Sequence, residues 1–255
     1  MVLETKRLIL REYTPEDFSW LYEIISDPET MRHYPKPYDE AGTNRWIQWN
    51  LNNYREYGFG LWVMELKSTG EPIGDCGITM QRINGKMLPE IGYHLNKAYW
   101  RQGYGSEAAK AVRDWGFTNR EFDSLYSYMN DTNVASYSTA AAVGMKRIES
   151  YEEAGEGRLY VYAITRQEWI DLTVVRVQKM EQYFNALLEM QAVDPSAVKT
   201  EPAAGMLREL LAYYENGLWL RDYEMDEAGL LPKDLKRGVL AQDAVFDFLQ
   251  ENIAE

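Results

Sequence analysis

Hydrophobic positions in roughly the first 165 residues follow two periods. Alternation typical of a strand with one polar face occurs in KRLILRE, and the helical spacing of TPEDFSWLYEII follows it, opening on a capping-box pair, Thr14 and Asp17. A second helix is predicted over TNRWIQWNLNNYREY. Between residues 58 and 95, turn signals at STGE and INGK separate three hydrophobic runs, which predicts a three-stranded antiparallel meander.

The two periods continue after the meander. The residues that follow YWRQGYG have helical spacing, SLYSYMN predicts a buried strand, and NVASYSTAAAVG predicts a helix ending at Gly144, a common residue after a helix. MKRIESYEE and RLYVYAIT, joined by AGEG, predict a last hairpin. We therefore expect an α+β domain in this part of the chain.

From about residue 170 onward the hydrophobic spacing is helical only. The predicted helices contain Met180 to Leu188, then Leu207 to Tyr214, then the run AQDAVFDFLQEN. The aromatic residues of this part predict its core: Tyr213, Tyr214, Trp219 and Tyr223. The acidic group formed by Asp222, Glu224, Asp226 and Glu227 is expected on a solvated face. We predict an α+β domain over residues 1–168 and a small all-α domain over residues 169–255.

Composition narrows the possible functions. A formal net charge of −13 disfavours binding along a nucleic-acid backbone. The single cysteine, Cys76, excludes an internal disulfide and fits a reducing cytoplasm, and two histidines are too few for a Cys/His metal cluster. No signal peptide and no apolar run of about 20 residues is visible. We expect a cytoplasmic protein with no metal, no nucleic-acid partner and no membrane partner; the oligomeric state stays open, a homodimer included.

The stretch YWRQGYGSEAAKAV places Gly103 and Gly105 directly before a predicted helix. Glycines at that position expose the first backbone N–H groups of the helix, which can bind a phosphate. With Ala108 the spacing also matches a dinucleotide fingerprint, but NKAYWRQ separates it from the preceding strand, and that strand is predicted antiparallel. No Lys-Ser/Thr follows, as a P-loop would require. A tight turn into a helix is the alternative without a ligand.

Three segments together, TKRLILRE, EIGYHLNKAYWRQGYGSEA and NVASYSTAAAVGMK, resemble the GNAT superfamily of N-acetyltransferases in its RimJ/RimL-like branch. The resemblance covers residues 1 to about 168. It implies a mixed, mostly antiparallel twisted sheet whose strands Glu90–Leu95 and Ser124–Asn130 part to admit acetyl-CoA as co-substrate. Trp100 stands where the superfamily often has Gln or Arg, a position at which this branch commonly has Trp. Ala140 stands where many members have a Tyr that protonates the departing thiolate.

The resemblance also implies which residues bind the co-substrate. The loop before the helix would wrap the pyrophosphate, the strand before it would bind the pantetheine arm through its backbone, and Asn133 would reach the same arm or simply cap its helix. The implied co-substrate residues are Gly92, Tyr93, His94, Leu95, Arg101, Gln102, Gly103, Tyr104, Gly105, Ser106 and Asn133.

Acetyl transfer needs a neutral amine, so a proton acceptor is expected beside the thioester. Glu90 is our candidate base, with an ordinary strand-edge residue as the alternative. Backbone N–H groups near Tyr93 to Leu95 could bind the developing oxyanion. Ser136 and its neighbour Tyr137 are candidates for the general acid, although a thiolate leaves readily without one.

The acceptor is predicted to meet residues of the second helix and of the proline-rich loop before it. The candidates are His33, Tyr34, Trp46 and Trp49, with a surface loop and helix packing as their structural alternatives. His94 is expected to face away from the Tyr93 side of its strand and could equally be a packed histidine.

The last part of the chain, about residues 176–252, resembles a small bacterial domain family of unknown function, through MEQYFNALLEM, LRELLAYYENGLWLRDYE and LPKDLKRGVLAQDAVFDFL. The leading interpretation is an acetyl-CoA-dependent N-acetyltransferase acting on a protein N-terminus or a small amine. The alternative is a non-catalytic acetyl-CoA-binding regulatory protein on a degenerate fold.

Overall fold

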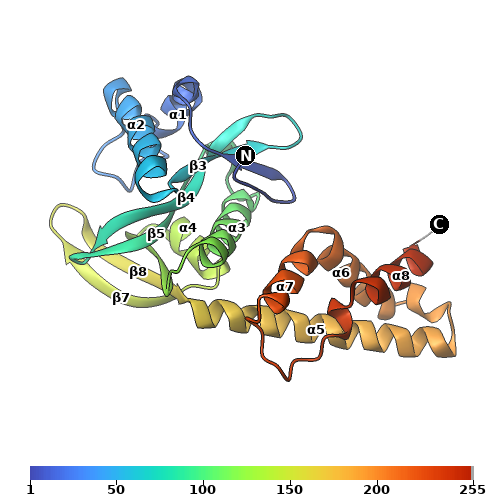
Figure 1. The fold of residues 1–255 in the computed structure, drawn as a ribbon. Helices are drawn as coiled ribbons and strands as arrows, with labels where there is room; N and C mark the ends of the chain where they lie inside the picture. The colour runs from blue at the N-terminus through green and yellow to red at the C-terminus, as the bar shows by residue number, and fades with distance from the viewer. Residues whose placement is uncertain (254–255) are drawn as a thin grey trace. The chain divides into compact units, whose positions relative to one another are not determined.

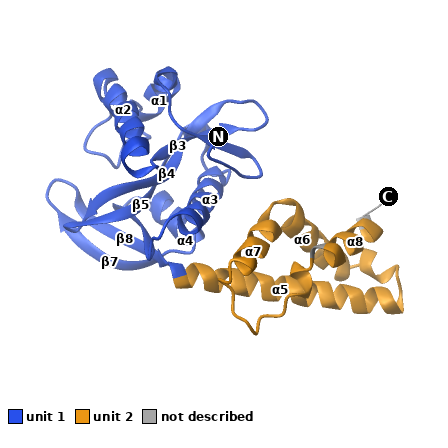
Figure 2. Cartoon of the chain, in the orientation of Figure 1, with its two compact units in different colours: residues 1–166 blue, residues 167–255 orange. Residues whose placement is uncertain are grey.

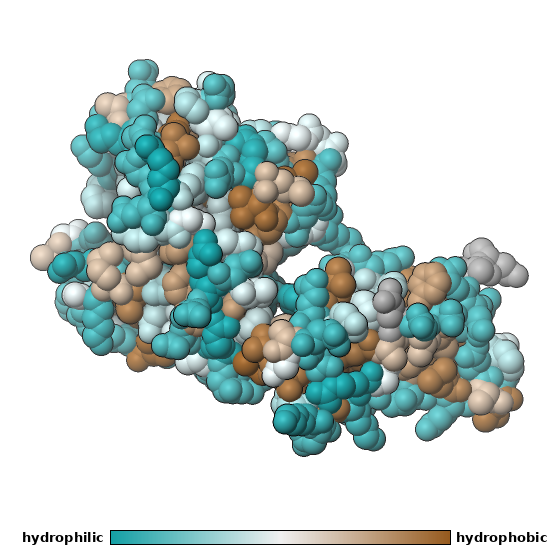
Figure 3. All heavy atoms as spheres, viewed as in Figure 1, coloured by the Kyte–Doolittle hydropathy of each residue, from teal (hydrophilic) through white to brown (hydrophobic). Residues whose placement is uncertain are grey.

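The computed structural model describes residues 1–253 and forms two compact units, residues 1–166 and residues 167–255 (Figure 2). Each unit has its own buried core. None of the helices in residues 1–253 combines the length and the hydropathy that crossing a membrane requires. In the space-filling view, hydrophilic residues cover much of the visible face of both units, and hydrophobic residues lie in separate groups among them (Figure 3).

The first unit is built on one eight-stranded sheet. Its strands are β1 (Leu3–Glu4), β2 (Leu8–Arg11), β3 (Leu61–Leu66), β4 (Pro72–Ile83), β5 (Lys86–Leu95), β6 (Ser124–Asn130), β7 (Lys146–Glu153) and β8 (Gly157–Thr165). They lie in the order β1-β2-β3-β4-β5-β6-β8-β7, and every neighbouring pair is antiparallel except β5 and β6. The predicted α+β fold with a mixed, mostly antiparallel sheet is confirmed.

Helices cover both faces of this sheet (Figure 1). They are α1 (Phe18–Ile25), α2 (Glu40–Tyr57), α3 (Tyr104–Asn119) and α4 (Val134–Ala142). On one face, Ile24 of α1 and Ile47 of α2 join a core cluster with Val63 of β3. On the other, α3 approaches the sheet so closely that a Cβ on Gly116 would lie 2.6 Å from Ile78 Cδ1 of β4. The sheet therefore separates an α1–α2 side from an α3–α4 side.

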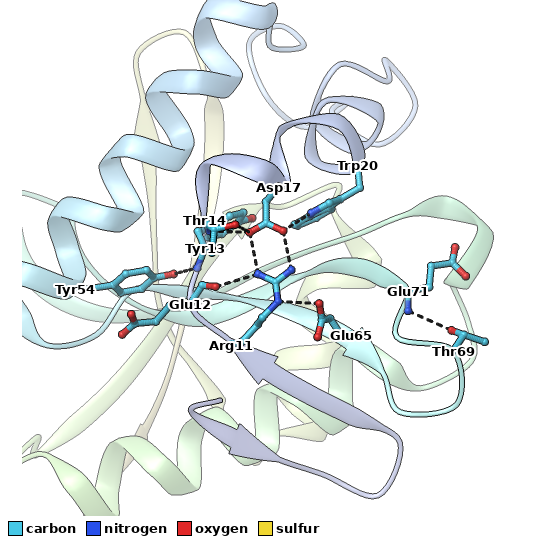
Figure 4. Close-up of polar contacts among 10 residues, drawn as sticks. All are labelled: Arg11, Glu12, Tyr13, Thr14, Asp17, Trp20, Tyr54, Glu65, Thr69 and Glu71. Carbon is cyan, nitrogen blue, oxygen red and sulfur yellow. Dashed lines mark hydrogen bonds and ion pairs between the residues drawn. The ribbon is translucent and has the colours of Figure 1, made fainter.

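An ion-pair network fixes the start of α1 to the edge of the sheet. The Arg11 guanidinium on β2 binds Asp17 through two hydrogen bonds of 2.7 and 2.8 Å, and its Nε donates to Glu65 of β3 at 2.7 Å (Figure 4). Asp17 also accepts from the Thr14 amide, which confirms the predicted capping box. Burial raises the pKa of Asp17, but hydrogen bonds from Arg11 and Trp20 outweigh that effect and lower it overall.

The second unit is all-helical, as predicted. Its helices are α5 (Arg166–Val193, whose first residue belongs to the first unit), α6 (Ala203–Glu215), α7 (Leu218–Glu227) and α8 (Gln242–Ile253). Trp219 is 5% exposed and lies between the rings of Tyr214 and Tyr223, with ring centroids 5.2 and 5.3 Å away. The predicted aromatic core is therefore present in this unit.

The expectation for one acidic residue of the second unit is wrong. Asp222 is fully buried rather than on a solvated face. Its carboxylate accepts from Arg176 Nε at 2.7 Å and from the Tyr213 hydroxyl at 3.0 Å. A buried carboxylate needs such donors because water no longer solvates it. The Asp222 carboxylate of α7 thus joins α5 and α6 inside the unit through these two hydrogen bonds.

Candidate functional site

The sheet opens between β5 and β6. The two strands pair in parallel only at Glu90 and Tyr126, and the Ser127 hydroxyl donates to the Ile91 carbonyl at 2.5 Å. From there β5 runs on to Leu95 paired with β4, and β6 runs on to Asn130 paired with β8. The edge of β5 over residues 92–95 therefore faces a gap in which backbone groups can bind a ligand.

This gap is part of a cleft of about 1360 Å³, which extends to both sides of it. All but two of the predicted site residues line it. Those that line it are His33, Tyr34, Trp46, Trp49, Glu90, Gly92, Tyr93, His94, Leu95, Arg101, Gly103, Tyr104, Gly105, Ser106, Asn133 and Ser136. The two that do not are Gln102, whose side chain donates to the Ala98 carbonyl, and Tyr137, whose ring stacks on Tyr162 of β8.

The first turn of α3 forms a cradle at one end of the cleft. Gly103 precedes the helix with a φ of +81°, a conformation that favours glycine, and Arg101 has a φ of +60°. A Cβ on Gly105 would meet no atom within 4 Å, so this turn presents bare backbone to open space. The free N–H groups of a helix start, together with the helix dipole, suit a diphosphate. The backbone of residues 101–106 is therefore compatible with the predicted pyrophosphate site.

The cradle is held from outside the cleft by Arg7. This side chain donates to the Gln102 carbonyl at 2.9 Å and to Glu107 Oε2 at 2.6 Å. Burial raises the pKa of Glu107, but hydrogen bonds from Thr5 and Arg7 outweigh it, and the pKa is lowered. The one carboxylate in the first turn of α3 is thus neutralised by an ion pair. The ion pair with Arg7 therefore reduces the repulsion between the Glu107 carboxylate and a bound phosphate.

The start of α4 lies on the α3–α4 side of the gap. Asn133 caps this helix by accepting from the Ser136 amide at 3.2 Å, and it also lines the cleft, so both predicted roles are compatible with its position. The Tyr93 hydroxyl donates to the Ser136 carbonyl at 2.8 Å and lies 3.2 Å from the Ser136 hydroxyl. Ala140 is buried, and its methyl group provides no proton donor.

Glu90 lies where β5 and β6 begin to part. Burial raises the pKa of its carboxyl to about 7, although the charge of His94 and hydrogen bonds from Thr79 and the Tyr128 backbone act in the opposite direction. A carboxyl group with a pKa near neutral pH is suited to proton transfer. The position of Glu90 and its raised pKa are therefore compatible with the predicted role of proton acceptor, which stays a prediction.

His94 lies on the opposite face of β5 from Tyr93, as expected. It contacts the Trp46 indole, with ring centroids 5.1 Å apart, and its Nδ1 lies 2.9 Å from Asp75 Oδ1. The Tyr34 hydroxyl lies 2.6 Å from His94 Nε2. Asp75 is fully buried and was not among the predicted site residues. The only signal in the sequence was an acidic residue inside the hydrophobic run PIGDCGITM.

Comparisons with known proteins give the family. Residues 7–146 match the family described as Acetyltransferase (GNAT) domain, and residues 177–254 match a domain of unknown function, DUF4298. The uncharacterized protein YkkB of Bacillus subtilis (strain 168) is 38% identical over 144 residues, which are 56% of this chain and 84% of YkkB. The uncharacterized N-acetyltransferase YnaD of the same organism is 28% identical over 175 residues, 66% of this chain and 99% of YnaD.

A solved structure shows the same fold. RimL, a ribosomal L7/L12 α-N-protein acetyltransferase in complex with coenzyme A, has a TM-score of 0.54 and 16% identity, covering 64% of this chain and 97% of its own. Among the described residues, no three His, Cys, Asp or Glu side chains gather as a metal ion would require. The family match spans more than half of the sequence and coincides with the parted sheet and the glycine cradle. This chain belongs to the GNAT acetyltransferase family.

Proposed function

We propose that this protein transfers the acetyl group of acetyl-CoA to a primary amine, carried by a small molecule or by a protein N-terminus. One observation supports this most strongly. The gap between β5 and β6 runs beside the cradle of α3 and begins at Glu90, so one cleft contains a phosphate-binding surface and a carboxyl group of pKa about 7.

The chain's own groups fit the parts of coenzyme A in order along the cleft. Arg101 and the backbone of residues 103–106 bind the pyrophosphate, because they combine a cation with the N–H groups of a helix start. The edge of β5 over residues 92–95 binds the amide-bearing pantetheine arm. Asn133 and Ser136 face the same arm from α4.

Glu90 accepts a proton from the ammonium form of the substrate, and the neutral amine then attacks the thioester carbonyl. The backbone N–H groups of residues 93 and 95 stabilise the negative charge that develops on the carbonyl oxygen, since that of His94 donates to Asp75. The C–S bond breaks as the C–N bond forms, and the thiolate leaves on the α4 side, where Ser136 supplies a hydroxyl. A thiol with a pKa near 8.5 is a good leaving group, so the missing Tyr at Ala140 is compatible with turnover.

The test is a binding titration with acetyl-CoA followed by a thiol-release assay with spermidine, benzylamine and an Ala-initiated peptide. The proposal expects binding and turnover with at least one of these amines, and loss of turnover in Glu90→Gln. The buried Ala140 favours a second candidate, a regulatory protein without catalysis. That candidate expects acetyl-CoA binding with no thiol release from any of the amines, which would reject the enzymatic proposal.

A further inference from the structure

The face of β5 that points toward α2 carries a hollow. Glu90, Gly92 and His94 share this face because side chains alternate along a strand. A Cβ built on Gly92 would lie 3.4 Å from Glu90 Oε2 and 3.5 Å from Leu61 Cδ2. The Glu90 carboxylate therefore leans over Gly92 toward His94. The space above Gly92 lies in the cleft and has a carboxylate at its border.

Asp75 determines which ring nitrogen of the neutral His94 imidazole carries the proton. The buried carboxylate accepts from the His94 backbone amide at 3.0 Å, from the Tyr13 hydroxyl at 2.6 Å, and contacts His94 Nδ1 at 2.9 Å. Because an ionised carboxylate can only accept, Nδ1 carries the proton of the neutral imidazole. His94 Nε2 is then the acceptor, and the Tyr34 hydroxyl donates to it.

This hydrogen bond orients the Tyr34 hydroxyl. Its proton is directed to His94, so the lone pairs of its oxygen remain for a donor in the cleft, such as an amine N–H. Tyr34 comes from the loop between α1 and α2, and the residue is 39% exposed, so the contact does not depend on a packed core position. The hydroxyl and the Glu90 carboxylate both line the cleft on the α1–α2 side of the sheet.

We propose that the acceptor amine binds over Gly92 between the Glu90 carboxylate and the Tyr34 hydroxyl, and that Asp75 and His94 position this hydroxyl and take one proton through it. The inference rests on the proposed function and assigns its acceptor site. Tyr34 contacts the substrate, whereas Asp75 and His94 act through Tyr34 and are positioning residues.

The proton balance requires two acceptors. An ammonium substrate loses one proton before attack and a second one once the C–N bond has formed. Glu90 takes one. The other passes to the Tyr34 oxygen while the Tyr34 proton moves to His94 Nε2, where Asp75 stabilises the resulting imidazolium. Burial lowers the pKa of His94, but Asp75 and Glu90 raise it overall, so the transfer operates above this pKa, where the imidazole is neutral and its Nε2 can accept the proton. One proton finally protonates the thiolate and the other leaves to solvent.

The kinetic test uses the full chain and whichever of spermidine, benzylamine and the Ala-initiated peptide gives the fastest thiol release. Tyr34→Phe should lower kcat/KM for the amine by about 10- to 100-fold and leave the KM of acetyl-CoA unchanged. Gly92→Ala should fold, because its Cβ meets ordinary contact distances, and should raise the amine KM at least about 10-fold. The matched control is Tyr57→Phe, an exposed tyrosine that does not line the cleft.

A double-mutant cycle separates positioning from simple stability. Asp75→Asn should reproduce the loss of Tyr34→Phe, and the double variant should lose no more than either single variant, because both changes act on one hydroxyl. Wild-type constants in Tyr34→Phe, or additive losses in the double variant, would overturn the inference while the proposed function stands. Absence of turnover by the wild-type protein with all three amines would overturn both.

A spectroscopic readout is independent of the acceptor. The sequence has two histidines, so imidazole ¹⁵N signals can be assigned with His33→Gln alone. We expect neutral His94 to be protonated at Nδ1 in the wild-type protein and to lose this preference in Asp75→Asn. A proton on Nε2 in the wild-type protein would contradict the proposed direction of the Tyr34 hydrogen bond.

Discussion

Arg7 and Glu107 join the N-terminal part of the sheet to the first turn of α3 by an ion pair with an Nε–Oε2 distance of 2.6 Å. The two residues are 100 positions apart in the sequence. The same guanidinium donates a hydrogen bond to the carbonyl of Gln102, which lies in the segment of residues 101–106 before and at the start of α3. A residue outside the cleft thus fixes the backbone that we expect to hold a pyrophosphate.

Removing this support should weaken co-substrate binding. Arg7→Ala is expected to raise the dissociation constant of acetyl-CoA by about 5- to 20-fold, because the loop must then be ordered at the expense of binding free energy. Isothermal titration calorimetry measures the effect. Arg158→Ala, which breaks an exposed ion pair with Glu152, is the control and should change nothing. Equal affinity in Arg7→Ala and wild type would show that the loop needs no such support.

A side chain at Gly105 should separate binding from stability. The Cβ of Gly105→Ala would occupy open space, and alanine favours a helix over glycine, so the melting temperature should stay the same or rise slightly. The methyl group should nevertheless keep the pyrophosphate away from the backbone N–H groups and weaken acetyl-CoA binding at least about 10-fold. Lys110→Ala, an exposed change on the same helix, is the matched control. Retained affinity in Gly105→Ala would place the phosphates elsewhere.

The reaction rate should follow the ionisation of Glu90. Its pKa is about 7, and only the ionised carboxylate accepts a proton, so kcat should rise as the pH increases through 7 and then level off. Glu90→Gln should lower kcat by about 10²- to 10³-fold and change the pH profile, leaving the titration of His94, the second proposed proton acceptor. Rates measured between pH 5.5 and 9 with one amine test this. A pH profile of the variant identical in shape to that of the wild type would remove Glu90 from the mechanism.

The same pKa predicts an effect on stability with the opposite sign. Burial raises the folded-state pKa of Glu90 above its ordinary value, so its contribution to stability is present at low pH and is lost as the pH rises through about 7. The melting temperature of Glu90→Gln relative to wild type should therefore increase from pH 5 to pH 8 by roughly a few degrees. A constant difference across this range would contradict the raised pKa.

The second unit should depend on the buried charge of Asp222. Asp222→Ala leaves Arg176 without this carboxylate and the Tyr213 hydroxyl without its acceptor, which should destabilise the unit by about 3–5 kcal/mol. Faster amide hydrogen exchange in α6 and α7 would report the loss. Arg208→Ala breaks a pair with Glu201 whose side chains are 67% and 66% exposed, and it should cost at most about 1 kcal/mol. Unchanged exchange in Asp222→Ala would refute the structural role.

Local signals in the sequence were sufficient to predict most helices and strands of the fold. The Asn84-Gly85 turn has the positive φ angles of 44° and 78° that its dipeptide predicts, and Gly144 follows α4 with a φ of 96°. The helix α7 (Leu218–Glu227) was not predicted as a separate element. Gly217, with a φ of 75°, breaks α6 from α7, and a glycine near a helix end does not show whether a second helix follows.

The site was predictable where its residues are close in the sequence. The cradle and Glu90 belong to one stretch of chain, but the partners of His94 do not. Asp75 reaches it through the pairing of β4 with β5, and Tyr34 through a loop 60 residues away. Within α4, a rotation of about 100° per residue directs Tyr137 to β8 and Ser136 to the cleft, and periodicity alone did not distinguish these two neighbours.

The single parallel bridge between Glu90 and Tyr126 has a mechanical consequence. Two half-sheets joined near this bridge, by it and by the Ser127 hydroxyl bound to the Ile91 carbonyl, could change their opening angle while the ladders within each half stay intact. Displacement is then smallest at the bridge, where Glu90 lies, and largest at the mouth beside α3. The proposed base, Glu90, lies at this bridge, so a change in the opening angle would displace its carboxyl group less than it displaces the backbone at the α3 end of the gap.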